Sequence, residues 1–440
     1  MDQLTPSLAA LLCLESRCFR GEVFQMFRTM LGAWIVCLGR RTISRVWETT
    51  GLSQSQDHSA AFRLFSDAVW NWDEVCRLLL LEIVTYLVPG MEVWLVVDDT
   101  LCHKRGGHVA FGGIFLDAVL SSSQHKTFRF GNNWVTLGVV VQLPFRQDRY
   151  YCLNVLWRVC EKRGNKTTKE HRTKPQLAAE MIKRLAPWLP HHKLRVVADV
   201  AYIGQHLLKD RPNNVEYLGP MRWDAAVTEP LPPSTRGSRK KGPRLPTPRE
   251  MLKECDGRWP VEKIELVYPH GVKELEVKVV RNVCWYHIAG ARPLMIVLVH
   301  DPEGKWRDEA LLSTDVTLTA QQVVGGYCRR WSVEVAYADS KGLLGFHDPE
   351  VWCPKSVQRA HPMSWYVGSL VILWYVMFGH EEPTPQRHRP WYKHKPEVTF
   401  ADMLATCRYH LWSHWLGKSA SREEFEARSS WLLEYLATAA

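Results

Sequence analysis

The sequence lacks the cysteine patterns that mark zinc-binding and disulfide-rich domains. Its 12 cysteines are scattered over 440 residues, and none forms a Cys-x-x-Cys pair or a Cys/His cluster with zinc spacing. We therefore expect reduced and mostly buried thiols in a cytoplasmic protein. The sequence also lacks an internal repeat and a glycine-rich loop of the P-loop kind, which excludes repeat architectures and P-loop nucleotide hydrolases.

Long hydrophobic runs are scarce as well. The most membrane-like run, MSWYVGSLVILWYVMFG at 363–379, has 17 residues, which is the lower limit for a membrane span, and it stands alone. At the N-terminus, Asp2 stands where a signal peptide has Lys or Arg, and the apolar run that follows is short. We expect no membrane association and interpret 363–379 as a buried helix.

Negative charge is in deficit, because 46 Asp and Glu face 56 Lys and Arg and leave a formal net charge of +10. This balance favours a polyanionic partner, although many proteins without such a partner are equally basic. The 20 Trp residues suit stacking on bases, but Trp is more often a core residue. The length predicts two or three globular domains.

Hydrophobic periodicity divides the chain into segments with different predicted secondary structure. The first segment has helical spacing, and the stretch TTGLSQSQ within it suits either a helix-turn-helix-like DNA reader or a plain helical bundle. The next has the order β, β, β, α, β, which indicates a mixed α/β sheet. The prediction divides the chain into five parts. They are an N-terminal helical DNA-binding domain (1–90), the first part of a catalytic core (91–215), a basic loop with an inserted β subdomain (216–316), the second part of the core (317–380) and a C-terminal helical region (381–440).

A basic, proline-rich loop, EPLPPSTRGSRKKGPRLPTPRE, begins the inserted part. Such a loop can contact phosphates through counterion release, or it can be a solvated linker. After it, KIELVYP, KELEVKVVR, CWYHIAG and LMIVLVH alternate like antiparallel strands. The cationic residues of the loop that we consider for DNA contact are Arg236, Arg239, Lys240, Lys241 and Arg244.

Acidic residues follow two of the predicted strands. MEVWLVVDDT contains Asp98 and Asp99, and KLRVVADVAYIG contains Asp199. Sites gather at the carboxyl ends of strands in open α/β sheets, so these acids are candidates for one cluster together with Glu334. Three such carboxylates suit phosphoryl transfer with two Mg²⁺ ions, although each Asp taken singly is equally consistent with a turn or helix cap.

The stretch YCRRWSVEVAYADSK, 327–341, predicts a helix, and Thr319 and Gln322 upstream have the spacing of a capping box. At about 100° per residue, Tyr327, Arg330, Glu334 and Lys341 fall within an arc of roughly 60°. One face therefore presents a carboxylate between two cations and a phenol, which suits a metal beside a phosphate. A solvated Arg330–Glu334 ion pair is the simpler interpretation of this helix alone.

Taken together, these motifs resemble the bacterial insertion-sequence transposases of the DDE superfamily, which have an RNase H-like core. Tyr327, Arg330, Glu334 and Lys341 match the Tyr-x2-Arg-x3-Glu-x6-Lys signature of one subgroup at every spacing. VVDDT and VVADVAYIG are similar to the first and second catalytic strands of that family. The expected fold is accordingly α/β, an RNase H-like mixed sheet flanked by helices, with an inserted β subdomain and an N-terminal helical domain.

The resemblance implies a metal-binding triad of Asp99, Asp199 and Glu334. Asp98 stays an open alternative to Asp99, since only one of two neighbours on a strand points into a site; Asp99 is preferred because such families place the acid directly before Thr. The expected cofactor is a pair of Mg²⁺ ions, for which Mn²⁺ can substitute. Tyr327, Arg330 and Lys341 would contact phosphates without reading sequence.

The implied function is DNA strand cleavage at transposon terminal inverted repeats, followed by strand transfer into target DNA. No covalent protein–DNA intermediate is expected, and a hairpin step stays open. The expected partners are double-stranded DNA and a second protein copy in the DNA complex, at the nucleoid in the cytoplasm. Two alternatives are a domesticated or regulatory DNA-binding protein on the same fold and another two-metal nuclease.

Overall fold

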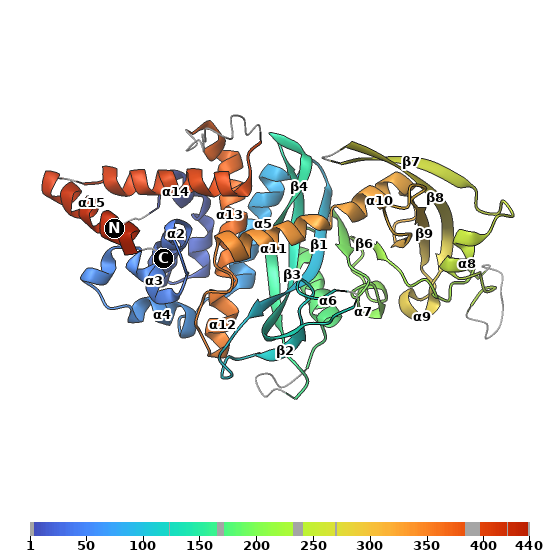
Figure 1. The fold of residues 1–440 in the computed structure, drawn as a ribbon, viewed down its shortest axis with the longest axis horizontal. Coiled ribbons are helices and arrows are strands. Elements are labelled where there is room, and N and C mark those ends of the chain that lie inside the picture. The colour runs from blue at the N-terminus through green and yellow to red at the C-terminus, as the bar shows by residue number, and fades with distance from the viewer. Residues whose placement is uncertain are drawn as a thin grey trace.

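In the part of the chain that the structure describes, the strands form one ten-stranded mixed sheet with helices packed against it (Figure 1). The computed structural model describes residues 4–122, 124–164, 171–231, 241–268, 271–382, 397–419 and 421–438. Within these residues the strand order is β2-β3-β1-β5-β6-β10-β9-β8-β7, and β4 pairs with β3. The strands are β1 (Glu92–His103), β2 (Gly113–Leu116), β3 (Phe128–Leu143), β4 (Arg146–Cys160), β5 (Lys193–Ala198), β6 (Val215–Pro220), β7 (Val261–Tyr268), β8 (Gly271–Cys284), β9 (Pro293–His300) and β10 (Glu309–Ser313).

The helices come mainly from the two ends of the chain. Among the described residues, five α-helices precede the sheet and several follow it, while α6 connects β4 to β5. The α-helices are α1 (Pro6–Leu11), α2 (Gly21–Val36), α3 (Ile43–Glu48), α4 (Ser59–Ser66), α5 (Trp72–Leu87), α6 (Lys174–Leu185), α7 (Gln205–Leu208), α8 (Pro248–Lys253), α9 (Tyr286–Ala289), α10 (Ala320–Cys328), α11 (Trp331–Leu343), α12 (Pro354–Ala360), α13 (Met363–Met377), α14 (Phe400–Gly417) and α15 (Arg422–Thr438). Short 3₁₀ turns η1 (Leu14–Cys18), η2 (Leu52–Gln54), η3 (Ala186–Trp188) and η4 (Gly379–Glu381) complete the set.

Parallel pairing is confined to the centre of the sheet. β5 pairs in parallel with β1 on one side and with β6 on the other, and the flanking pairs are antiparallel. The mixed α/β fold class predicted from the sequence is confirmed. Parallel strands need crossover connections. α6 lies in the connection that leads to β5, and α7 lies in the connection from β5 to β6.

The inserted strands extend the central sheet. β7, β8 and β9 join it through β10, which pairs with both β9 and β6. The expectation that CWYHIAG is a strand is wrong, because β8 ends at Cys284 and Tyr286–Ala289 forms the short helix α9. Strands β2, β6 and β10 were not predicted, since each is short and lacks clear alternation.

The apolar run 363–379 corresponds largely to α13. Twelve of its residues are buried, and the helix packs against β4, α5 and α14. This burial explains why the run is apolar on every side. Among the described residues, no helix combines the length and the apolar character that crossing a membrane requires.

The N-terminal helices pack directly on this central helix. Glu15 of η1 is fully buried, close to Glu82 of α5 and Tyr366 of α13. Burial raises the pKa of Glu15 to about 8, and the charge of Glu82 adds to the rise. The folded state therefore favours a protonated Glu15.

The division of the chain into five domains stays a prediction.

Glu15 makes stability depend on pH. Its folded pKa lies above its unfolded pKa, so its contribution is fully present below about pH 4.5 and is lost as pH rises through about 8. Glu15→Gln has no carboxyl group to ionise, so it avoids the loss of stability that the wild type undergoes as pH rises. We expect the stability of the variant relative to the wild type to be higher at pH 8 than at pH 5, by up to roughly 3 kcal/mol. Urea unfolding at the two pH values measures the effect.

The matched control is Glu22→Gln, at an exposed acid of α2. This substitution should leave the pH dependence unchanged. An equal pH dependence for the wild type and Glu15→Gln would contradict a protonated Glu15.

Candidate active site

Two acids are brought together by the register of β1 and β5. The parallel pairing runs from Glu92 opposite Lys193 to Val97 opposite Ala198. The next residue on β1 is Asp98, and Asp199 directly follows the end of β5. Paired residues in a parallel sheet point to the same face, so this register, continued by one residue, brings the two acids to one side of the sheet. The charges of both act on Arg330.

Asp98 and Asp99 point to opposite faces of β1 and meet different elements. An Asp98 oxygen accepts a hydrogen bond from Arg330 Nη1 at 2.7 Å, at the junction of α10 and α11. Asp99 instead accepts from Lys174 Nζ at the start of α6, at 2.6 Å. The preference for Asp99 as the site acid is not supported by this geometry, which favours Asp98.

Aligning the two predicted strands favours Asp98. The acids that end LVVD (95–98) and VVAD (196–199) occupy equivalent positions, each one residue beyond the last observed pair, Val97 with Ala198. The rule that the acid precedes Thr favours Asp99, because it uses local sequence and ignores the neighbouring strand.

Arg330 links the strand acids to the helix acid. Its Nη1 atom lies 2.7 Å from Asp98 Oδ2 and 3.5 Å from Glu334 Oε1. Burial lowers the pKa of Arg330, but Asp98, Tyr327, Asp199 and Glu334 together raise it above its usual value. One guanidinium is thus the shared counter-charge of the three acids.

Burial dominates the electrostatics of Asp98. The residue is 9% exposed, and this burial raises its pKa to about 7 against the opposing effect of Arg330. The charges of Asp99 and Glu334 raise the pKa further. The pKa of Asp98 thus stays near 7 even with Arg330 beside it, and a further cation would favour the ionised form.

The helix expected across 319–341 is interrupted. The capping box of Thr319 and Gln322 is present, but α10 ends at Cys328 and α11 begins at Trp331. At the junction, Arg330 N donates to Tyr327 O and Ser332 N donates to Arg329 O, which are i to i−3 bonds. The prediction of one continuous helical face is wrong, since Arg330 lies in the turn between two helices.

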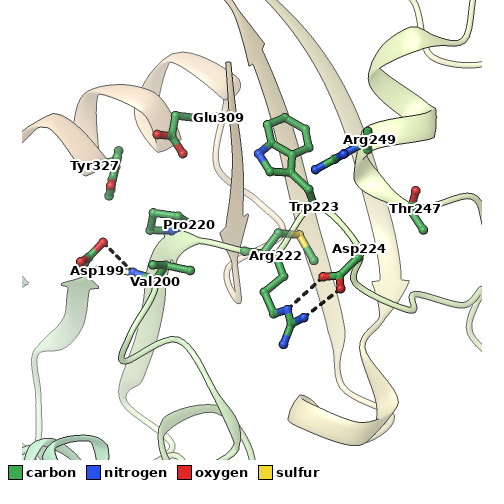
Figure 2. Close-up of a pocket in the computed structure, with 11 residues that line it drawn as sticks. Asp199, Val200, Pro220, Arg222, Trp223, Asp224, Thr247, Arg249, Glu309 and Tyr327 are labelled. Carbon is green, nitrogen blue, oxygen red and sulfur yellow. Dashed lines mark hydrogen bonds and ion pairs between the residues drawn. The ribbon is translucent and has the colours of Figure 1, made fainter. Parts of the chain in front are cut away.

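A pocket of about 660 Å³ opens beside Asp199 (Figure 2). Glu309 of β10 and Tyr327 line it near Asp199, whereas Trp223 and Arg249 line its other end. Burial raises the pKa of Glu309, and the charge of Asp199 raises it further. Sequence analysis missed Glu309, because it begins a short strand that the pattern did not predict.

Trp331, Tyr327 and Arg330 also border a larger cleft of about 1210 Å³, which lies between α10 and the inserted strands. In the same cleft Arg329 stacks over Trp94, with its guanidinium carbon 4.1 Å from the ring centroid. Arginine and aromatic side chains on one cleft wall are the residue types that contact phosphates and bases. This wall continues directly into the acidic site through Arg330.

The remaining predicted cations lie in different places. Burial lowers the pKa of Lys341 against the opposing effect of the charges of Asp117 and Glu334. Lys241 Nζ lies 3.0 Å from His287 Nε2, and the backbone of Arg244 forms an isolated antiparallel β-bridge with that of Thr228. Both cations lie in the inserted part. The other loop cations, Arg236, Arg239 and Lys240, lie outside the described residues.

The donor set fits a divalent metal in its chemistry. Asp98, Asp199 and Glu334 supply the oxygen ligands that hard cations prefer, and all three already act on one cation, Arg330. In the described part of the chain, no three Asp, Glu, His or Cys side chains are yet close enough to hold a metal ion. Carboxylates repel one another without a metal, so they would move closer when one binds.

Comparison with known proteins gives one family. Residues 14–287 match the family described as DDE superfamily endonuclease, and this range includes Asp98 and Asp199 but ends before Glu334. A search of curated proteins found no match.

Close contact with β1 positions α10. A Cβ atom on Gly326 would lie 2.5 Å from the Trp94 ring, whereas one on the neighbouring Gly325 would come no nearer than 3.7 Å to Leu266. Gly326 therefore allows the close approach that places Tyr327 and Arg330 beside the sheet.

These adjacent glycines provide a matched test. Both substitutions to Ala gain about 0.5–1 kcal/mol of helix propensity. We expect Gly325→Ala to be neutral or stabilising and Gly326→Ala to destabilise by about 1–3 kcal/mol, because it overpacks Trp94. Urea unfolding of the two variants measures the difference; equal stabilities would contradict the close approach.

Proposed function

The chain belongs to the DDE superfamily of endonucleases, and we propose that it is the transposase of a bacterial insertion sequence. The family implies DNA as the substrate and divalent metal ions as cofactors. The proposal adds that the substrate is the pair of terminal inverted repeats and that the reaction includes strand transfer into target DNA.

The proposal is carried by one observation, the register of β1 and β5. The pairing ends one residue before Asp98 and Asp199, both acids act on Arg330, and Arg330 connects Asp98 to Glu334. We assign Asp98, Asp199 and Glu334 as the metal-binding acids. The spacing of Tyr327, Arg330, Glu334 and Lys341 supports the subgroup named by that signature.

The acidic residues of the site would bind the metal ions, and the cationic residues with Tyr327 would bind the DNA phosphates. Asp98, Asp199 and Glu334 would hold two Mg²⁺ ions, which when bound supply the Lewis acidity that activates the attacking oxygen and stabilises the leaving one. Tyr327, Arg330 and Lys341 would bind the phosphates that flank the scissile bond and orient it for in-line attack. These contacts position the strand without reading its bases.

The cleft between α10 and the inserted strands gives the DNA a path away from the acids. Its arginine and aromatic walls meet the site at Arg330, and Lys241 and Arg244 lie on the inserted part. Two transposon ends must be held together for transfer, so we propose a dimer in the DNA complex. The protein would act at the nucleoid.

Cleavage of a labelled duplex that carries the flanking inverted repeats tests the proposal. With Mg²⁺, we expect the wild type to nick at the repeat end and Asp98→Asn, Asp199→Asn and Glu334→Gln each to lose at least about 10³-fold in rate, as expected for residues that act as a unit. The amide variants should bind the duplex in a gel-shift assay as the wild type does. Equal cleavage by the wild type and all three variants, or no binding of the duplex, would reject the function.

Arg330 generates a separate prediction about metal binding without DNA. Because its guanidinium neutralises Asp98 and Glu334, it competes with a divalent cation for the same carboxylates. Arg330→Gln should therefore tighten Mn²⁺ binding by about tenfold in the absence of DNA and weaken binding of the duplex. Electron paramagnetic resonance titration with Mn²⁺ measures the first effect.

Arg258→Gln is the matched control for this titration, because Arg258 pairs with Glu229 on the inserted part. It should not change Mn²⁺ binding. Unchanged Mn²⁺ affinity in Arg330→Gln would show that the ion pair does not compete with the metal.

A further inference from the structure

Asp99 has both oxygens engaged by other elements of the core. Its Oδ2 accepts from Lys174 Nζ at 2.6 Å, and its Oδ1 accepts from the Tyr202 hydroxyl at 2.7 Å. The Asp99 side chain is 21% exposed and that of Lys174 is 35% exposed. An acid held in this way on the far face from Arg330 is satisfied without a metal.

Tyr202 belongs to the turn that carries Asp199. The carbonyl of Asp199 accepts from Tyr202 N at 2.9 Å and from Ile203 N at 3.3 Å, which closes the turn immediately after β5. Tyr202 is 1% exposed, and burial, with the charge of Asp99, raises its pKa well above the usual value, so its hydroxyl remains a donor. The hydroxyl therefore ties the turn of the second acid to β1.

The other side of the turn is backed by β6. A Cβ atom on Gly219 would lie 2.4 Å from Ala198 O and 2.7 Å from Ile203 Cγ1. The backbone of β6 thus lies directly against the turn. With β6 on one side and the Tyr202–Asp99 bond on the other, the turn has little freedom to move Asp199.

Lys174 adds the start of α6 to the same contact. Thr173 and Gln176 form a capping box there, which fixes the first turn of the helix that presents Lys174. Asp99 therefore joins β1, the first turn of α6 and the turn after β5. All three elements converge on the residue next to Asp98.

We propose that Asp99, Tyr202 and Lys174 form a lock that sets the position of Asp199 relative to Asp98. Asp99 is then a positioning residue and binds no metal. The inference rests on the proposed function, since it concerns how the two strand acids are spaced for the ions. Outer-shell partners of metal ligands typically change metal affinity or activity by 10–100-fold when they are removed.

Tyr202→Phe tests the lock, because it removes one hydroxyl and keeps the buried ring. Mn²⁺ is titrated by electron paramagnetic resonance in the presence of the duplex, and cleavage rate and duplex affinity are measured in parallel. We expect Mn²⁺ affinity and cleavage rate each to fall about tenfold or more, with duplex affinity unchanged. Tyr217→Phe, at a buried tyrosine of the neighbouring β6, is the matched control and should change none of the three.

Asp99→Asn separates a positioning role from a ligand role. An amide oxygen can still accept from Tyr202, so this variant should retain more cleavage and Mn²⁺ affinity than Asp99→Ala, whereas Asp98→Asn should lose cleavage. Asp99→Asn as inactive as Asp98→Asn, or Tyr202→Phe with wild-type Mn²⁺ affinity, would overturn the lock. A wild type that binds Mn²⁺ but cleaves no duplex would reject the proposed function alone, because the Mn²⁺ titrations still test the lock.

Discussion

Three acids that gather in one place repel one another unless a cation lies among them, and this constraint organises the centre of the molecule. Here the cation is the guanidinium of Arg330, which contacts Asp98 and Glu334 and also acts on Asp199. Burial strengthens the requirement, since it raises the pKa of Asp98 to about 7 against the opposing effect of Arg330. The break between α10 and α11 serves the same end, because it places Arg330 in a turn beside the strand acids.

The single sheet explains how distant segments reach one site. β1 and β5 bring the first two acids, β10 brings Glu309, and the helices that follow β10 bring Arg330 and Glu334. The inserted strands are continuous with the core sheet through β10, so the cleft that they border has a fixed position relative to the acids. An insertion that extends a sheet in this way can present a binding surface without a flexible hinge.

Much of the fold follows from the sequence, because buried strands and capped helices have strong local patterns. The sequence patterns predict strands at 91–100, 133–145 and 193–204, and the structure has strands at 92–103, 128–143 and 193–198. They also predict the capping box at Thr319 and a buried helix at 363–379, which is α13 at 363–377. The helix break at Arg330 was not, since i to i−3 turns leave little trace in composition. Likewise, the position of Glu309 and the preference for Asp98 depend on strand pairing, and the β1–β5 pairing links residues 101 positions apart, such as Val97 and Ala198.

The two neighbouring acids of β1 have different contacts. Asp98 faces Arg330 on one side of the sheet, and Asp99 faces Tyr202 and Lys174 on the other. Gain or loss of a single residue earlier in this strand would slip it by one position and exchange the two faces. Each acid would then meet the partners of its neighbour, so a change in the length of β1 should disturb both acids at once, whereas a substitution disturbs one.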